Sequence, residues 1–161
     1  RVADFKNAII IMTSNMGAHI IQERFEDIDM SNRDDITNRT KDEVVELLKQ
    51  TVRPEFLNRI DEIIMFTPLN KKEIGQIVKL QLNHLKKMLD EKGIAFDATD
   101  EAIEALSEKG YDPQFGARPV KRVIQREILN QLSKEILAAK INAESSILLD
   151  AFDGKFVFRN K

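Results

Sequence analysis

Two polar residues stand where a phosphate or another anion could be bound. Asn15 follows the apolar, β-branched run of residues 7–12, at the carboxyl end of an expected parallel strand, where open α/β sheets bind ligands. Arg118 directly precedes Pro119 at the start of a long amphipathic pattern. A cation there meets the positive end of a helix dipole, which becomes favourable when an anion lies between them. A salt bridge to Asp112 or to another nearby acid explains Arg118 equally well.

Arg59 is a third candidate, although its spacing by itself favours a structural explanation. It lies in a short turn just before the apolar run of residues 62–66 and is close in sequence to Asp61 and Glu62. Either carboxylate could form a surface salt bridge with it. From spacing alone, this pairing is the preferred interpretation.

Other site chemistries have little support in the sequence. The chain contains no cysteine and only two isolated histidines, His19 and His84, which excludes thiolate and Cys/His zinc sites. Acidic pairs such as Asp34–Asp35 are typical of solvated surface in a chain with this charge density. No Gly-x-x-x-x-Gly-Lys-Ser/Thr phosphate loop occurs, since Gly154–Lys155 lacks the upstream glycine.

The composition is that of a globular protein near neutrality. The 161 residues, 42% of them apolar, are enough for one ordinary domain or two small ones. With 25 basic and 27 acidic side chains, a role in coating nucleic acid is disfavoured. No apolar run approaches the roughly 20 residues that cross a bilayer, and the lack of cysteine favours a cytoplasmic protein. Because the chain begins with Arg1 and soon enters an apolar run, we expect it to be a piece of a longer polypeptide.

The first part of the chain has the pattern of an α/β layer. The runs at residues 7–12 and 62–66 are continuously apolar, which predicts two strands buried on both faces of a parallel sheet. Between them we expect a short helix over 18–25 and a polar, mobile loop over 26–39. A capping box then begins at Thr40 and predicts a helix that ends before Arg53–Pro54.

After Pro68 the pattern changes to long amphipathic helices, which places a domain boundary there. A cap at Asn70 begins a helix that stops at Gly93, a second helix is expected over 99–110, and the longest follows Pro119. The apolar stretches 147–152 and 155–159 flank Asp–Gly, the dipeptide favoured in a two-residue hairpin turn. Residues 94–96 could add a third strand. We therefore expect a small α+β domain.

Three motifs together resemble the second AAA+ module of the Clp ATPases. They are Thr-Ser-Asn at 13–15, Arg-Pro-Glu-Phe-Leu-Asn-Arg-Ile-Asp-Glu at 53–62 and Gly-Tyr-Asp-Pro-Gln-Phe-Gly-Ala-Arg-Pro at 110–119. Residues 2–7 and 21–25 are most similar to the ClpB-type disaggregases. The resemblance implies that residues 1–67 are the C-terminal portion of the large α/β subdomain of a P-loop AAA+ module. Residues 68–161 would then form its small C-terminal domain.

The resemblance also implies roles for the three candidates. Asn15 corresponds to sensor 1, which polarises the water that attacks the γ-phosphate of ATP. Arg59 corresponds to the arginine finger, which reaches into the site of the neighbouring subunit. Arg118 corresponds to sensor 2, which reports the nucleotide state to the small domain. Ile77 and Ala117 are weaker candidates for contacts with the adenine base.

The function implied is that of part of an ATP-dependent protein-remodelling chaperone. Such proteins are homo-hexamers that use ATP with Mg²⁺ and act on aggregated or misfolded proteins, with a probable co-chaperone system. Their phosphate loop, Mg²⁺-binding strand and pore loops precede the segment that corresponds to Arg1, so we expect the isolated chain to hydrolyse no ATP and to bind no nucleotide tightly. The alternatives are a Clp unfoldase subunit that feeds a protease and a helical interaction domain without nucleotide chemistry.

Overall fold

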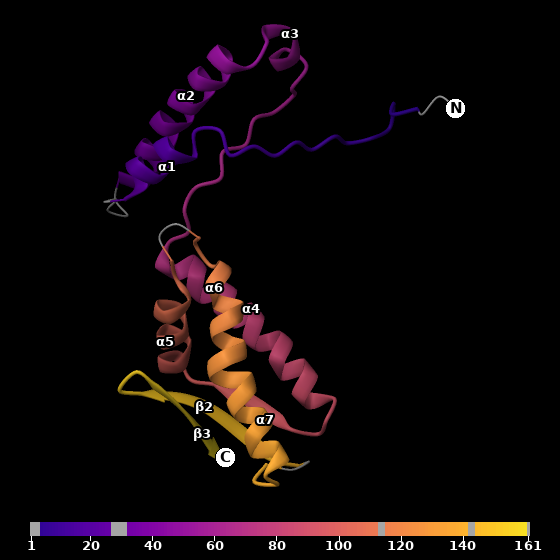
Figure 1. Cartoon of the computed structure of the whole chain (residues 1–161), viewed down its shortest axis with the longest axis vertical. Coiled ribbons are helices and arrows are strands. Elements are labelled where there is room, and N and C mark those ends of the chain that lie inside the picture. Colours follow the sequence, from indigo (N-terminus) through magenta and orange to yellow (C-terminus); the bar gives the residue numbers. More distant parts are fainter. Residues whose placement is uncertain (1–3, 27–31, 113–114, 142–143, 161) are drawn as a thin grey trace. The chain divides into compact units, whose positions relative to one another are not determined.

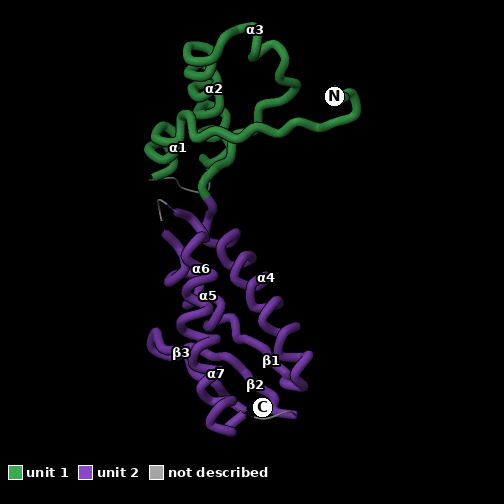
Figure 2. The backbone as a smooth tube through the Cα atoms, turned by 45° about the vertical axis from the view of Figure 1, so that its right-hand side comes forward, with its two compact units in different colours: residues 1–68 green, residues 69–161 purple. Residues whose placement is uncertain are grey.

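The computed structural model describes residues 4–26, 32–112, 115–141 and 144–160. The chain divides into two compact units, which Figure 2 shows in different colours. Unit 1 comprises residues 1–68 and unit 2 comprises residues 69–161. Each is described separately below.

The described residues of unit 1 form three helices, α1 (Ala18–Phe25), α2 (Arg33–Thr51) and α3 (Pro54–Leu57) (Figure 1). The predicted helix over 18–25 is therefore confirmed. Helix α1 packs along α2, and an ion pair of 3.1 Å between Arg24 Nη2 and Glu43 Oε1 links the two helices. As predicted, α2 ends before Arg53–Pro54, because a residue that precedes proline is pushed out of the helical region.

The two predicted buried strands of unit 1 do not form in this structure. Neither residues 7–12 nor residues 62–66 are in a strand, and Ile9 is 91% exposed while Phe66 is 84% exposed. A central parallel strand needs a neighbour to satisfy its backbone and layers that cover both its faces. Within the described residues the one sheet belongs to unit 2, so these apolar segments lie extended without such partners.

The predicted loop over 26–39 and the predicted capping box at Thr40 are wrong where the structure describes them, residues 27–31 lying outside that part. Helix α2 begins at Arg33, and Thr40 is buried within it, 1% exposed. The acidic residues Asp34 and Asp35 lie in its first turn, where they complement the helix dipole. Asp35 also forms an i,i+4 ion pair of 2.9 Å with Arg39. A polar stretch without an apolar period is helical here because local charge pairing supports it.

Unit 2 is a small α+β domain, and this predicted fold class is confirmed. Two helices, α4 (Lys71–Asp90) and α5 (Asp100–Gly110), precede one long helical segment. That segment consists of α6 (Arg118–Val123), the π-helix η2 (Ile124–Leu129) and α7 (Asn130–Leu137). The sheet contains β1 (Ala95–Ala98), β2 (Ser146–Phe152) and β3 (Lys155–Asn160), with β1 parallel and β3 antiparallel to the central β2 (Figure 1).

The caps and turns of unit 2 follow the sequence signals closely. Glu73 donates its backbone N–H to Asn70 Oδ1 at 2.8 Å, and its carboxylate accepts the Asn70 N–H at 2.7 Å, which completes the capping box of α4. The hairpin between β2 and β3 turns at Asp153 and Gly154, whose φ angles are 51° and 72°. Two positive φ angles are what a type I′ turn requires.

The π-helix explains how the long helical segment keeps one face in the core. Val120, Ile124, Ile128 and Leu132 recur at four-residue intervals, and all four are buried. On an α-helix each such step overshoots a full turn by about 40°, so the apolar stripe would rotate away from the core. A π turn takes up an extra residue and corrects this drift. The stripe therefore remains on the face that packs against the other buried residues of unit 2.

Candidate functional site

Asn15 lies in a tight turn that leads into α1. Its backbone C=O accepts the N–H of Ala18 at 3.1 Å, and Ser14 Oγ accepts the N–H of Met16 at 3.1 Å. The local hydrogen bonds therefore fix the backbone while the Asn15 side chain is exposed. The exposed amide is available as a donor and as an acceptor.

Gly17 holds this turn against α2. Its φ of 76° is left-handed, and a Cβ built at this position would lie 2.9 Å from Val44 Cγ2. Only glycine satisfies both the conformation and the close approach. No motif singles out Gly17, although a glycine between a polar turn and a helix is a recognisable signal for such a contact.

Arg59 follows α3 in a run of short turns. Its N–H donates to Phe56 C=O at 3.1 Å, and the next N–H, that of Ile60, donates to Leu57 C=O at 3.0 Å. The Arg59 side chain is exposed and forms no ion pair or hydrogen bond with the described residues. The preferred interpretation of a salt bridge to Asp61 or Glu62 is therefore wrong for this structure.

Arg118 is the first residue of α6 and follows a closed loop. Asp112 and Gly116 exchange two backbone hydrogen bonds, of 3.0 and 2.7 Å, and Asp112 Oδ1 accepts the N–H of Phe115 at 2.9 Å. Asp112 therefore serves the loop and forms no salt bridge with Arg118, whose side chain is exposed. The structural alternative for Arg118 is not realised among the described residues.

Ile77 and Ala117 lie beside the core of unit 2. Both are half-buried and pack against the buried cluster, Ile77 from α4 and Ala117 from the residue before α6. Gly110 allows α5 and α6 to approach each other, because a Cβ there would lie 2.7 Å from Val120 Cγ2. These contacts position Ile77, Ala117 and Arg118 on one unit, whereas Asn15 and Arg59 belong to the other.

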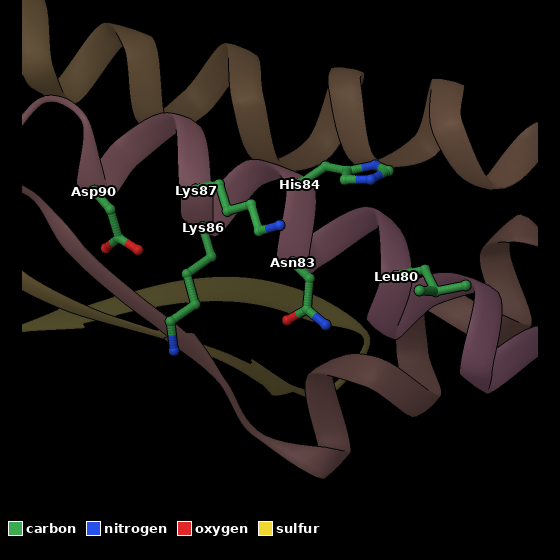
Figure 3. Close-up of a pocket in the computed structure, with 6 residues that line it drawn as sticks. All are labelled: Leu80, Asn83, His84, Lys86, Lys87 and Asp90. Atoms are coloured by element: carbon green, nitrogen blue, oxygen red, sulfur yellow. The ribbon is translucent and has the colours of Figure 1, made fainter.

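Two hollows on the described surface are lined by none of these residues. One hollow lies on α4 and is lined by Leu80, Asn83, His84, Lys86, Lys87 and Asp90, whose side chains fan out along the helix (Figure 3). A second lies on the long helical segment and begins at Pro119, one residue after Arg118. All six residues of the first hollow come from one helix, so it is an open surface depression.

Among the described residues, no three acidic or histidine side chains come close enough to hold a metal ion. None of the helices that the structure describes combines the length and the apolar character needed to cross a membrane.

Family models match both parts of the chain. Residues 69–149 match the C-terminal, D2-small domain of ClpB protein, and residues 1–63 match the AAA domain of the Cdc48 subfamily. The first of these matches covers half of the chain.

Curated relatives match almost the whole chain. The chaperone proteins ClpB of Porphyromonas gingivalis and Bacteroides thetaiotaomicron are each 52% identical to it over 160 residues, 99% of this chain. The probable chaperone protein ClpB 1 of Chlorobaculum tepidum is 44% identical over 161 residues. The chain spans only 18%, 19% and 37% of the lengths of these three relatives.

Proposed function

The chain belongs to the ClpB family of AAA+ proteins, and from that premise we propose that it is the C-terminal part of the second AAA+ module of an ATP-dependent disaggregase. In this proposal residues 1–67, all of which lie in unit 1, are the end of the large subdomain. Residues 68–161, which are unit 2 together with Pro68, are the small C-terminal domain. The printed sequence holds no phosphate loop, so the chain would supply only part of a nucleotide site.

The proposal rests on two arginine side chains that pair with no carboxylate among the described residues. Arg59 and Arg118 each follow a backbone turn that fixes their position, and neither guanidinium is paired with a described carboxylate. An unpaired, positioned guanidinium suits an anionic phosphate, which it can contact with two parallel N–H donors. This donor chemistry fits a nucleoside triphosphate and supports the roles that the family motifs imply.

Unit 1 would contribute the residues that act during hydrolysis. When bound, ATP with Mg²⁺ would supply the phosphoryl group whose transfer drives the motor. The side chain of Asn15 would orient the attacking water, a role that suits an exposed amide on a rigid turn. Arg59 would reach into the site of the neighbouring subunit and neutralise the charge that develops on the γ-phosphate.

Unit 2 would report the nucleotide state. Arg118 would contact the phosphates from the start of α6, while Ile77 and Ala117 would border the adenine. Because both apolar residues pack against the core, a shift of the nucleotide would be transmitted to the whole small domain.

The proposed oligomer follows from the role of Arg59 as an arginine finger. A residue that acts across an interface requires a neighbouring subunit, and the family architecture implies a homo-hexamer. We propose aggregated or misfolded proteins as substrates, a co-chaperone system as partner and the cytoplasm as location. No nucleic acid or membrane is proposed as a partner.

The test is Arg59→Ala in the full-length protein with its first module inactivated. We expect ATP hydrolysis to fall by about 10³-fold, with little change in nucleotide affinity, because a finger supplied in trans acts on the transition state of its neighbour. Arg39→Ala is the matched control, since among the described residues that exposed arginine pairs with Asp35 alone. Unchanged hydrolysis, or an equal loss of nucleotide affinity, would contradict the proposal.

Mixed oligomers separate action in trans from a local defect. Subunits that carry Arg59→Ala are combined with subunits that lack the phosphate-loop lysine of the same module. Hydrolysis should return only where an intact nucleotide site meets an intact arginine. If mixing restores nothing although mixed oligomers form, Arg59 acts within its own subunit.

A further inference from the structure

The segment that joins the two units is extended and has no regular secondary structure. Residues 61–70 form neither helix nor strand. Their side chains alternate, since Ile63 and Met65 are half-buried while Ile64 and Phe66 are 67% and 84% exposed. Such a segment could act as a loose tether about ten residues long, unless something fixes its end.

Arg33 fixes that end to α2. Its Nη2 donates to the backbone C=O of Pro68 at 2.7 Å and lies 3.4 Å from Thr67 Oγ1, across 35 and 34 residues of sequence. Both contacts are partly buried. A hydrogen bond from a charged donor is stronger than a neutral one, and partial burial protects it from competition by water.

The other side of the junction is fixed by unit 2. Asn70 is held by the capping box of α4, and Leu69 packs against the core cluster. Proline fixes its own φ. Because the latched group is the Pro68 C=O, ψ of Pro68 is restrained as well, and the free backbone rotations between the two anchors are the two dihedral angles of Leu69. Figure 2 changes colour at this junction.

We propose that Arg33 is a latch that confines the pivot between the two units to the Pro68–Leu69 junction. With the latch closed, unit 1 reaches to Pro68 as one body, and its movement acts on unit 2 through a single hinge. With the latch open, residues 61–68 become a flexible tether, and movement of unit 1 is no longer transmitted. The latch involves none of Asn15, Arg59 and Arg118, so its test is independent of the proposed function.

Limited proteolysis with chymotrypsin tests the latch in the 161-residue chain. The Phe66–Thr67 bond is adjacent to the latch, and a protease must draw several flanking residues into its cleft. Arg33→Ala should raise the cleavage rate at this bond about tenfold, because cleavage follows the population of the open form. The Phe5–Lys6 bond, with Phe5 66% exposed, serves as the reference within the same chain.

The variants distinguish a latch from general support of α2. Arg39→Ala removes another arginine from the same helix and should leave the rate at Phe66–Thr67 unchanged. Arg33→Gln keeps a helix-forming side chain with a neutral donor and should give an intermediate rate, with the helix content seen by circular dichroism preserved. Equal rates for the wild type, Arg33→Ala and Arg33→Gln would overturn the proposal.

A distance measurement tests the pivot directly. The chain has no cysteine, so cysteines introduced at the exposed positions Glu46 of α2 and Glu101 of α5 accept two spin labels. Arg33→Ala should broaden the distribution of distances between the labels, and Arg39→Ala should not. A distribution of unchanged width in Arg33→Ala, with α2 still helical, would show that the pivot is not set by Arg33.

Discussion

Units 1 and 2 contain similar proportions of apolar residues but bury these residues very differently. Among the described residues, Val44 is the one buried hydrophobic residue of unit 1, whereas the core cluster lies entirely in unit 2. Unit 1 instead exposes most of the apolar run over 7–12, together with Ile64 and Phe66. Helices form in both units, so the difference lies in packing and not in local structure.

The difference shows what makes a segment of this chain self-sufficient. Unit 2 closes its core because α4, α5, the long helical segment and the sheet all pack against one cluster. The described residues of unit 1 form helices and extended apolar segments but no layer that covers those segments. We therefore expect unit 2 to carry nearly all of the cooperative stability of this chain.

The largest expected effect comes from opening the core of unit 2. Ile128 is 0% exposed, so Ile128→Ala should lower the free energy of unfolding of unit 2 by about 2–5 kcal/mol. Leu137→Ala, at a position 87% exposed on the same long helical segment, is the matched control and should change it by less than about 0.5 kcal/mol. Urea unfolding followed by circular dichroism measures both. Equal effects would mean that the cluster is not a closed core.

A glycine-to-alanine substitution in each unit gives a smaller contrast in stability. At Gly110 a Cβ would lie 2.7 Å from Val120 Cγ2 and 3.0 Å from its Cα, so Gly110→Ala should force α5 and α6 apart and cost unit 2 about 1–3 kcal/mol.

Gly17→Ala is the counterpart in unit 1. Its Cβ would crowd Val44 and its φ would be strained, so α1 should detach from α2 while the urea midpoint of unit 2 stays unchanged. Amide exchange in α1 reports the first effect. A shift in the unfolding of unit 2 would show that the two units are not energetically independent.

Most of unit 2 could be predicted because its signals are local. The Asn70 cap, the Asp–Gly turn and the four-residue apolar stripe each act over a few residues, and the structure realises all three. The π-helix was not predictable as such, since it arises from the need to keep that stripe on one face. In unit 1 the strand predictions failed because a buried strand depends on neighbours far away in sequence.

In the candidate site, too, the local features could be predicted and the long-range contacts could not. The motifs around Asn15, Arg59 and Arg118 identify the family, and the local turns that hold these residues are formed by nearby hydrogen bonds. Whether Arg59 and Arg118 pair with carboxylates depended on side-chain placement, which spacing does not determine. The contact between Arg33 and Pro68 joins residues 35 positions apart and leaves no local pattern in the sequence.

The smallest expected effect concerns Thr40 and decides between the predicted and the observed start of α2. Thr40 is 1% exposed, and its Oγ1 has no hydrogen-bond partner among the described residues. A buried hydroxyl without a partner costs free energy, and valine has the same shape and a similar helix propensity. Thr40→Val should therefore stabilise α2 by roughly 0.5–1 kcal/mol, measured by amide exchange within the helix.

Thr37→Val, one turn earlier in α2, should change the stability of the helix in the opposite direction. Thr37 Oγ1 donates to Arg33 C=O at 2.7 Å in a partly buried position, so Thr37→Val loses a hydrogen bond and should destabilise α2 by roughly 0.5–1 kcal/mol. If Thr40 instead capped a helix that begins there, Thr40→Val would cost about 1 kcal/mol. The signs of the two valine variants therefore test whether α2 begins at Arg33 and buries Thr40 within the helix.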